Sequence, residues 1–96
     1  MRLSPNEISA IKKTILGIDA AAVIYLFGSR VQDDLKGGDI DLVVLSTKLS
    51  FTNKLDILAE IKSLIGDQKI DLRIVEPEAL QSDPFLLSIK NSMVRL

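Results

Sequence analysis

The sequence predicts a small α+β (mixed α/β) fold, with a mixed three- to four-stranded sheet and helices packed on one face. Three observations predict it. Apolar runs of strand length alternate with segments of helical periodicity, glycines separate the two kinds of segment, and 47% of the residues are hydrophobic. A chain of 96 residues supplies one hydrophobic core. We therefore expect a single domain over residues 1–96.

The first helix is expected over about residues 5–16. Ser4 is a capping residue, Pro5 suits the first helical position and Glu7 completes a capping box. Apolar residues follow at helical spacing at Ile8, Ile11 and Ile15. Gly17 then predicts a left-handed stop at the end of this helix.

Two strands are expected on either side of a polar segment. Residues 21–27 form an apolar run typical of a strand buried on both faces. Residues 29–38 are polar and glycine-rich, which predicts a short helical turn and a flexible loop. Residues 39–45 form the second strand. Because strand side chains alternate, Ile40, Leu42 and Val44 share one face, while Asp39, Asp41, Val43 and Leu45 share the other.

A second helix and a third strand complete the expected core. Helical periodicity covers residues 52–65, and Gly66 closes the helix. Its apolar stripe is expected at Leu55, Leu58, Ile61, Leu64 and Ile65. Residues 69–75 alternate as a strand, with Asp71 and Arg73 on the face opposite its apolar residues. After residue 77 we expect a short helix, then another that starts at Ser82-Asp83-Pro84.

Composition excludes several classes of site. The chain has neither cysteine nor histidine, which excludes disulfides, thiolate zinc sites and catalysis by Cys or His. Lys and Arg number 12 against 13 Asp and Glu, so we expect no direct nucleic-acid binding. No segment has the pattern of a signal peptide or of a membrane span. We therefore expect no membrane association and a cytoplasmic location.

Three acids are the candidate catalytic and metal-binding residues. Asp39 and Asp41 are one residue apart on a predicted strand, so both carboxylates project from one face. Asp71 lies at a comparable point of another strand. Oxygen ligands without His or Cys suit Mg²⁺ better than zinc, and Mg²⁺ completes its shell with water and substrate phosphates. The pattern therefore predicts a site for magnesium and a nucleotide.

Gly28 and Ser29 supply the second half of the predicted site. A glycine that leaves a buried strand lets backbone N–H groups and the serine hydroxyl approach a triphosphate. Arg30 either adds positive charge for nucleotide binding or is a surface cation. Arg73 shares a face with Asp71, and we expect the two side chains to pair.

These residues resemble the polymerase β nucleotidyltransferase superfamily, and in particular the minimal nucleotidyltransferases that act as antitoxins beside HEPN-domain toxins in prokaryotes. The resemblance rests on Leu26-Phe27-Gly28-Ser29-Arg30, Gly38-Asp39-Ile40-Asp41-Leu42-Val43-Val44 and Ile70-Asp71-Leu72. It covers nearly the whole chain. One difference is that Gly38 precedes the first acid, where the family usually has serine.

The resemblance implies the small polymerase β-like nucleotidyltransferase fold and a role for each residue. It implies that Gly28 and Ser29 hold the triphosphate of ATP and that Asp39 and Asp41 bind two Mg²⁺ ions. Asp71 would then help to activate the attacking hydroxyl. The implied activity is transfer of AMP from ATP to a partner protein, with a tyrosine of a HEPN-domain toxin as acceptor. Either a hetero-oligomer or a homodimer is compatible with this role.

Two other functions remain open from the sequence. The first is a non-enzymatic antitoxin that neutralises its toxin by direct binding, which the intact acids and the Gly-Ser pair disfavour. The second is nucleotidyl transfer to a small molecule, for which 96 residues leave no room for a substrate domain. For a protein partner, we expect aliphatic contacts near the segment from Phe85 to Leu96.

Overall fold

The computed structural model describes residues 1–33 and 38–96, which form a sheet of strand order β3-β2-β1-β4. Strand β1 is antiparallel to β2 and β4, whereas β2 and β3 are parallel, so the predicted mixed sheet is confirmed. The elements along the chain are α1 (Pro5–Ile18), β1 (Val23–Phe27), the 3₁₀ helix η1 (Gly28–Val31), β2 (Ile40–Leu45), α2 (Phe51–Ile65), β3 (Ile70–Val75), α3 (Ala79–Ser82), α4 (Pro84–Ile89) and β4 (Val94–Arg95). Part of the expected flexible loop lies outside the described residues.

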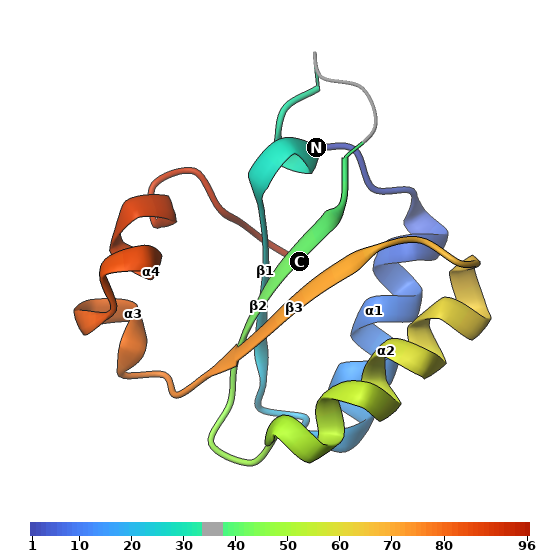
Figure 1. Cartoon of the computed structure of the whole chain (residues 1–96), viewed down its shortest axis with the longest axis horizontal. Coiled ribbons are helices and arrows are strands. Elements are labelled where there is room, and N and C mark those ends of the chain that lie inside the picture. Colours follow the sequence, from blue (N-terminus) through green and yellow to red (C-terminus); the bar gives the residue numbers. More distant parts are fainter. Residues whose placement is uncertain (34–37) are drawn as a thin grey trace.

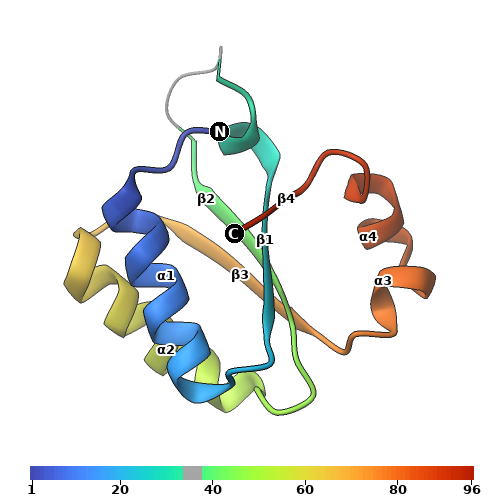
Figure 2. The ribbon, with the colours of Figure 1, turned by 180° about the vertical axis from the view of Figure 1, so that it is seen from behind.

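Helices cover the sheet from both sides (Figures 1 and 2). Helices α1 and α2 pack on the face that carries Leu42 and Val44, as the sequence predicts. The other face carries Val43 and Leu45, and residues of α3 and α4 pack against it. This smaller second layer was not predicted. It forms because apolar side chains on that face need cover from water.

The end of α1 differs from the prediction. Gly17 is not left-handed, and the helix continues to Ile18. Asp19 ends it instead, since its N–H donates to the Ile15 carbonyl at 3.0 Å. The buried Asp19 carboxylate accepts a 2.5 Å hydrogen bond from the hydroxyl of Ser46, which follows β2. This bond, with another from a backbone N–H, lowers the pKa of Asp19. Asp19 therefore joins α1 to the far end of β2.

The buried stripe of α2 is rotated relative to the prediction. Ile61 is fully buried as expected, but Ile57 is buried beside it. Leu55 and Leu64 are 69% and 49% exposed, so their expected place in the stripe was wrong. The C-cap at Gly66 is confirmed by its positive φ of 95°. Helix α2 therefore turns Ile57 and Ile61 toward the core, and Leu55 and Leu64 remain on the outside.

The C-terminal segment was predicted in part. Helix α4 begins at Pro84 as expected, and the Asp83 carboxylate caps it by accepting from two backbone N–H groups. The two-residue strand β4 was not predicted, because so short a segment has no periodicity to recognise. It pairs with Tyr25 and Leu26 of β1 and protects that edge of the sheet. Among the described helices, none is long and apolar enough to cross a membrane.

Candidate active site

The predicted acids meet at the end of the sheet where β1 ends and where β2 and β3 begin (Figure 1). Asp41 lies opposite Phe27 of β1 and, in parallel register, opposite Asp71 of β3. It is partly buried, whereas Asp71 is exposed on the edge strand. Asp39 immediately precedes β2, and its Oδ2 lies 3.5 Å from Nζ of Lys69. Strand alternation and register thus bring the carboxylates to one end of the sheet.

Asp41 carries the electrostatic signature of this site. Burial raises the pKa of its carboxyl group above the ordinary value, and the neighbouring charges of Asp71 and Asp39 raise it further. Arg73 and Lys69 oppose this shift only in part. Carboxylates that repel one another are stabilised by a divalent cation, so the donor set fits magnesium. No three acids of the described residues are already gathered tightly enough for a metal cluster.

Two glycines shape the backbone around the acids. Gly28 has a φ of 79°, and a Cβ at this position would overlap the Asp41 carboxylate. Gly38 has a φ of 87°, and a Cβ there would overlap the Ser29 hydroxyl. Both positions therefore require glycine on two counts, backbone conformation and close approach. In this chain the Ser29 hydroxyl occupies the space that a side chain at position 38 would need.

We expect Gly28→Ala to destabilise the protein by roughly 1–3 kcal/mol, because alanine is strained at positive φ and also displaces Asp41. Urea unfolding of the wild type and the variant measures the effect. Gly17→Ala is the matched control. Gly17 lies in α1 with open space around it, so alanine there should stabilise by roughly 0.5–1 kcal/mol. Equal stability of both alanine variants would contradict the close approach between Gly28 and Asp41.

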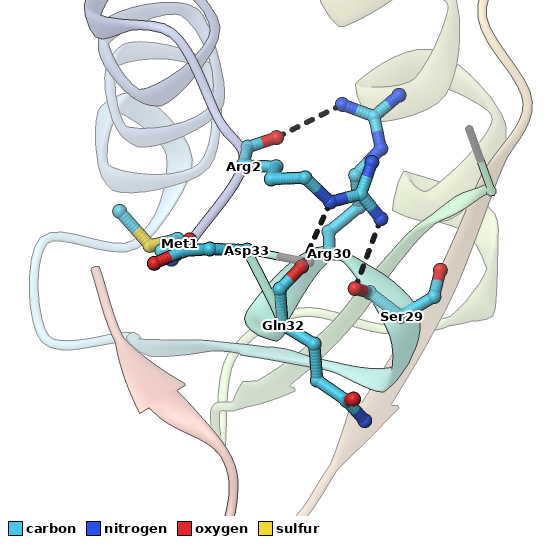
Figure 3. A network of polar contacts seen from close by, with 6 residues as sticks. All are labelled: Met1, Arg2, Ser29, Arg30, Gln32 and Asp33. Atoms are coloured by element: carbon cyan, nitrogen blue, oxygen red, sulfur yellow. Dashed lines mark hydrogen bonds and ion pairs between the residues drawn. The ribbon is translucent and has the colours of Figure 1, made fainter. Parts of the chain in front are cut away.

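Arg30 is held by protein acceptors (Figure 3). Its guanidinium donates to the Arg2 carbonyl at 3.0 Å, to the Gly38 carbonyl at 3.3 Å and to Oε1 of Gln68 at 3.2 Å. Gln68 in turn donates to Glu7 of α1 at 2.7 Å. These bonds tie the residues next to the acids to α1 and to the start of β3. We interpret Arg30 as a residue that positions the site.

Arg2 secures η1 from the other side (Figure 3). Its guanidinium donates to the carbonyls of Ser29 and Gln32, both at 2.9 Å. Its backbone N–H donates to the carbonyl of Arg30 at 2.6 Å. The Met1 amino group pairs with Asp33, which lowers the pKa of that carboxyl group. The N-terminal segment therefore fixes the turn that carries Ser29.

If the site binds ATP as the sequence predicts, Arg30→Ala should raise the KM for ATP several-fold and leave kcat at saturating ATP within about twofold, because the hydrogen bonds of Arg30 go to protein acceptors. Loss of its hydrogen bonds should also cost roughly 1–3 kcal/mol of stability. Steady-state kinetics with varied ATP checks this. A large loss of kcat at saturating ATP would show instead that Arg30 contacts the reacting phosphate.

The expected pairing of Arg73 with Asp71 was wrong. The Arg73 guanidinium lies over the Phe85 ring, 4.2 Å from its centroid. Phe85 packs edge-to-face against Phe27 with ring centroids 5.4 Å apart. The aromatic face of α4 therefore competes successfully for the guanidinium. Asp71 is left with its carboxylate exposed beside Asp41.

In a comparison with protein-family models, residues 9–93 match the family described as polymerase beta, nucleotidyltransferase. The chain belongs to the polymerase β nucleotidyltransferase family. No curated protein matches the sequence significantly. The family assignment confirms the predicted fold and supports a nucleotidyltransferase activity in general. Members typically use a nucleoside triphosphate and Mg²⁺. In this chain the candidate acids Asp41 and Asp71 lie in register on neighbouring strands.

Sequence reasoning missed the residues that support the nucleotidyltransferase site. Arg2 and Gln68 were not singled out, and Glu7 was predicted only as part of a capping box, although each belongs to the hydrogen-bonded network around Arg30 and Ser29. Burial raises the pKa of Glu7, but the hydrogen bonds from Ser4 and Gln68 outweigh it and lower the pKa overall. No local pattern identifies these contacts, because they join residues far apart in the chain.

Proposed function

We propose that the chain is a Mg²⁺-dependent enzyme that transfers AMP from ATP to a hydroxyl of a partner protein. One observation carries the proposal: the close approach of Gly28 to Asp41, with Asp71 in register on the next strand. The exposed Gly28 and the acids lie together at one open end of the sheet. A triphosphate has access from one side of Asp41, and an acceptor has access from the other.

The position of each candidate site residue determines the role that we propose for it. Gly28 and Ser29 bind the triphosphate through backbone N–H groups and the serine hydroxyl. Asp39 and Asp41 would hold Mg²⁺, which when bound would supply positive charge for the phosphates and for the attacking hydroxyl. Asp71 orients that hydroxyl from the edge strand and accepts its proton.

The reaction is an in-line displacement at the α-phosphorus of ATP. The acceptor oxygen forms a bond to this phosphorus, and the bond to the oxygen that bridges to the β-phosphate breaks. Pyrophosphate leaves with the bonding electrons. The hydroxyl proton passes to the Asp71 carboxylate, which is exposed and therefore returns the proton to solvent.

The biological role that we propose is that of an antitoxin. The acceptor is a tyrosine of a HEPN-domain toxin, and the attached AMP inactivates that toxin. Two features support a partner that comes from outside the domain. Asp71 is exposed on the edge strand, on the face that α3 and α4 cover only in part. Transfer to a protein also accounts for an acid site beside an open surface.

Mass spectrometry of the partner tests this function. The chain is incubated with ATP, Mg²⁺ and the small helical protein that co-purifies with it from its host. We expect one or more AMP groups on a tyrosine of the partner, and no modification when EDTA replaces Mg²⁺. In cells, co-expression should relieve toxicity of the partner. An unmodified partner together with full relief would contradict enzymatic action.

A further inference from the structure

A cavity of about 320 Å³ runs along the part of β3 that follows Asp71. Its walls are the beginning of α2, the outer edge of β3 and the beginning of α4. Phe51 and Lys54 line it from α2, and Phe85 and Arg73 line it from the opposite face of the sheet. Phe51 is 76% exposed, which is unusual for a phenylalanine in a folded domain. The groove therefore combines aromatic and charged side chains on a surface that the described residues leave open.

The floor of the groove is an unpaired strand edge. Strand β3 is the last strand of the sheet on this side. The carbonyls of Lys69 and Val75 accept hydrogen bonds from β2, at 3.1 and 3.0 Å. In a parallel pair, alternate residues bond to the neighbouring strand, so Leu72 and Ile74 direct their N–H and C=O groups outward. In the described part of the chain, no loop or turn hydrogen-bonds to these outward groups. Ile74 is partly exposed and accessible to another strand, whereas Leu72 is 1% exposed, so an added strand must displace the side chains that cover it.

Positive charge flanks this edge on both sides. Nζ of Lys54 lies 5.9 Å from the Phe51 ring centroid, and the Arg73 guanidinium lies over Phe85. The acid among the lining residues is Asp83, whose carboxylate caps α4. The groove is thus locally positive in a chain whose net charge is -1. Its complement is an acidic segment with apolar residues.

We propose that this groove binds an extended, acidic segment of the acceptor protein, which adds to the open edge of β3 as a further strand and presents its hydroxyl to Asp71. This inference rests on the proposed function and names how the acceptor is recognised. Asp71 and Arg73 lie on the same face of the same strand, about 7 Å apart along it. A strand that fills the groove therefore reaches the acid within two residues. Backbone pairing supplies affinity and the two aromatic walls select alternate side chains.

A peptide is a better fit than a nucleic acid. The groove offers two cations, too few for a tract of phosphates, and it offers backbone donors and acceptors that pair with another backbone. Transfer to the peptide follows the reaction given above, with its tyrosine oxygen bonded to the α-phosphorus, pyrophosphate released and the proton taken by Asp71.

The experiment uses short synthetic peptides of alternating glutamate and valine with a central tyrosine. Its controls are the same peptide with lysine for glutamate, and an oligoadenylate RNA of similar length. Binding to the full chain is measured by fluorescence anisotropy, and transfer from ATP by mass spectrometry. We expect the acidic peptide to bind at least about tenfold more tightly than the basic one. We also expect AMP on its tyrosine only.

A pair of N-methylated peptides tests the strand addition without altering the protein. One carries N-methyl groups on alternate residues, and the other carries them on the remaining residues. Only one edge of the peptide pairs with β3, so one methylation pattern should abolish binding and the other should preserve it. Loss with both patterns, or with neither, overturns the proposed pairing.

Charge reversal at Lys54 tests whether the positive charge of the groove attracts the acidic peptide. Lys54→Glu should weaken the acidic peptide by about tenfold, and an acid in the first turn of α2 is compatible with the helix. Lys13→Glu, on the exposed surface of α1, is the matched control and should change nothing. Equal effects of the two variants overturn the proposal, as does preferential transfer to RNA or a concentration-dependent dimer that closes the β3 edge.

Binding of ATP and Mg²⁺ without peptide is measured in parallel. If that binding is present and the peptide results fail, the groove is wrong and the proposed function stands.

Discussion

Asp41→Asn is expected to weaken Mg²⁺-dependent binding of ATP by about a hundredfold or more, because the loss of one carboxylate ligand costs roughly 3 kcal/mol of binding free energy. Asp41 lies at the centre of the site, between Gly28 and Asp71. Asparagine keeps its shape but not its charge. Calorimetric titration of ATP in the presence of Mg²⁺ measures the change. Asp56→Asn, an exposed acid on α2, is the matched control and should bind as the wild type does.

The same variant should make the protein without metal more stable at neutral pH. Burial and the nearby acids raise the pKa of Asp41 in the folded state above its unfolded value. The folded state therefore holds this proton at pH values where the unfolded state has released it, so stability falls as the pH rises through that window. Asparagine does not titrate, so Asp41→Asn removes this fall in stability with rising pH. Thermal unfolding without Mg²⁺ should give a higher Tm for Asp41→Asn at pH 7, and a smaller difference well below the ordinary pKa. A lower Tm at pH 7 would contradict repulsion among the acids.

Asp71→Ala should abolish transfer while leaving nucleotide binding largely in place. Asp71 is the exposed outer acid, so its loss leaves Asp39 and Asp41 beside Gly28. We expect the rate of AMP transfer to fall by about a thousandfold, which is the range for loss of a positioned base. Single-turnover measurements with saturating ATP and Mg²⁺ separate this rate from binding. The control is Asp67→Ala, an exposed acid just before β3.

This variant also separates the enzyme from an antitoxin that acts by covering its toxin. If transfer is the function, Asp71→Ala should still bind the partner but should no longer relieve its toxicity in cells. Full relief by Asp71→Ala, with an unmodified partner, would favour neutralisation by contact. The two readouts come from the same pair of proteins, so differences in folding between preparations do not enter the comparison.

The fold was predictable because its local signals are strong. Alternation in β2 and β3 places Asp41 and Asp71 on the face opposite Leu42 and Leu72, and the structure confirms this to within a residue or two at the strand ends. The turn at Gly28-Ser29 after β1 could be predicted from the sequence equally well. Each of these features follows from the covalent geometry of a strand and from burial of one face. The identity of the candidate site residues therefore needed no tertiary information.

The errors arose where tertiary packing decides between local alternatives. Ile57 and Leu55 are both compatible with a helical stripe, and only contact with α1 and the sheet determines that Ile57 is buried. Arg73 was expected to pair with Asp71, but its guanidinium lies over the ring of Phe85, which is distant in the sequence. Arg30 bonds to residues that lie 28 and 38 positions away. No period or spacing in the sequence encodes such contacts.

The most direct test of a nucleotidyltransferase is to follow the two ends of the triphosphate separately. The chain and its co-purifying partner are incubated with Mg²⁺ and with ATP labelled at either the α- or the γ-phosphate. The site around Gly28, Asp41 and Asp71 predicts label on the partner from the α-phosphate only, with release of pyrophosphate, and no transfer by Asp41→Asn. Label from the γ-phosphate, or transfer by Asp41→Asn at the wild-type rate, would contradict the assignment of these residues as a nucleotidyl-transfer site.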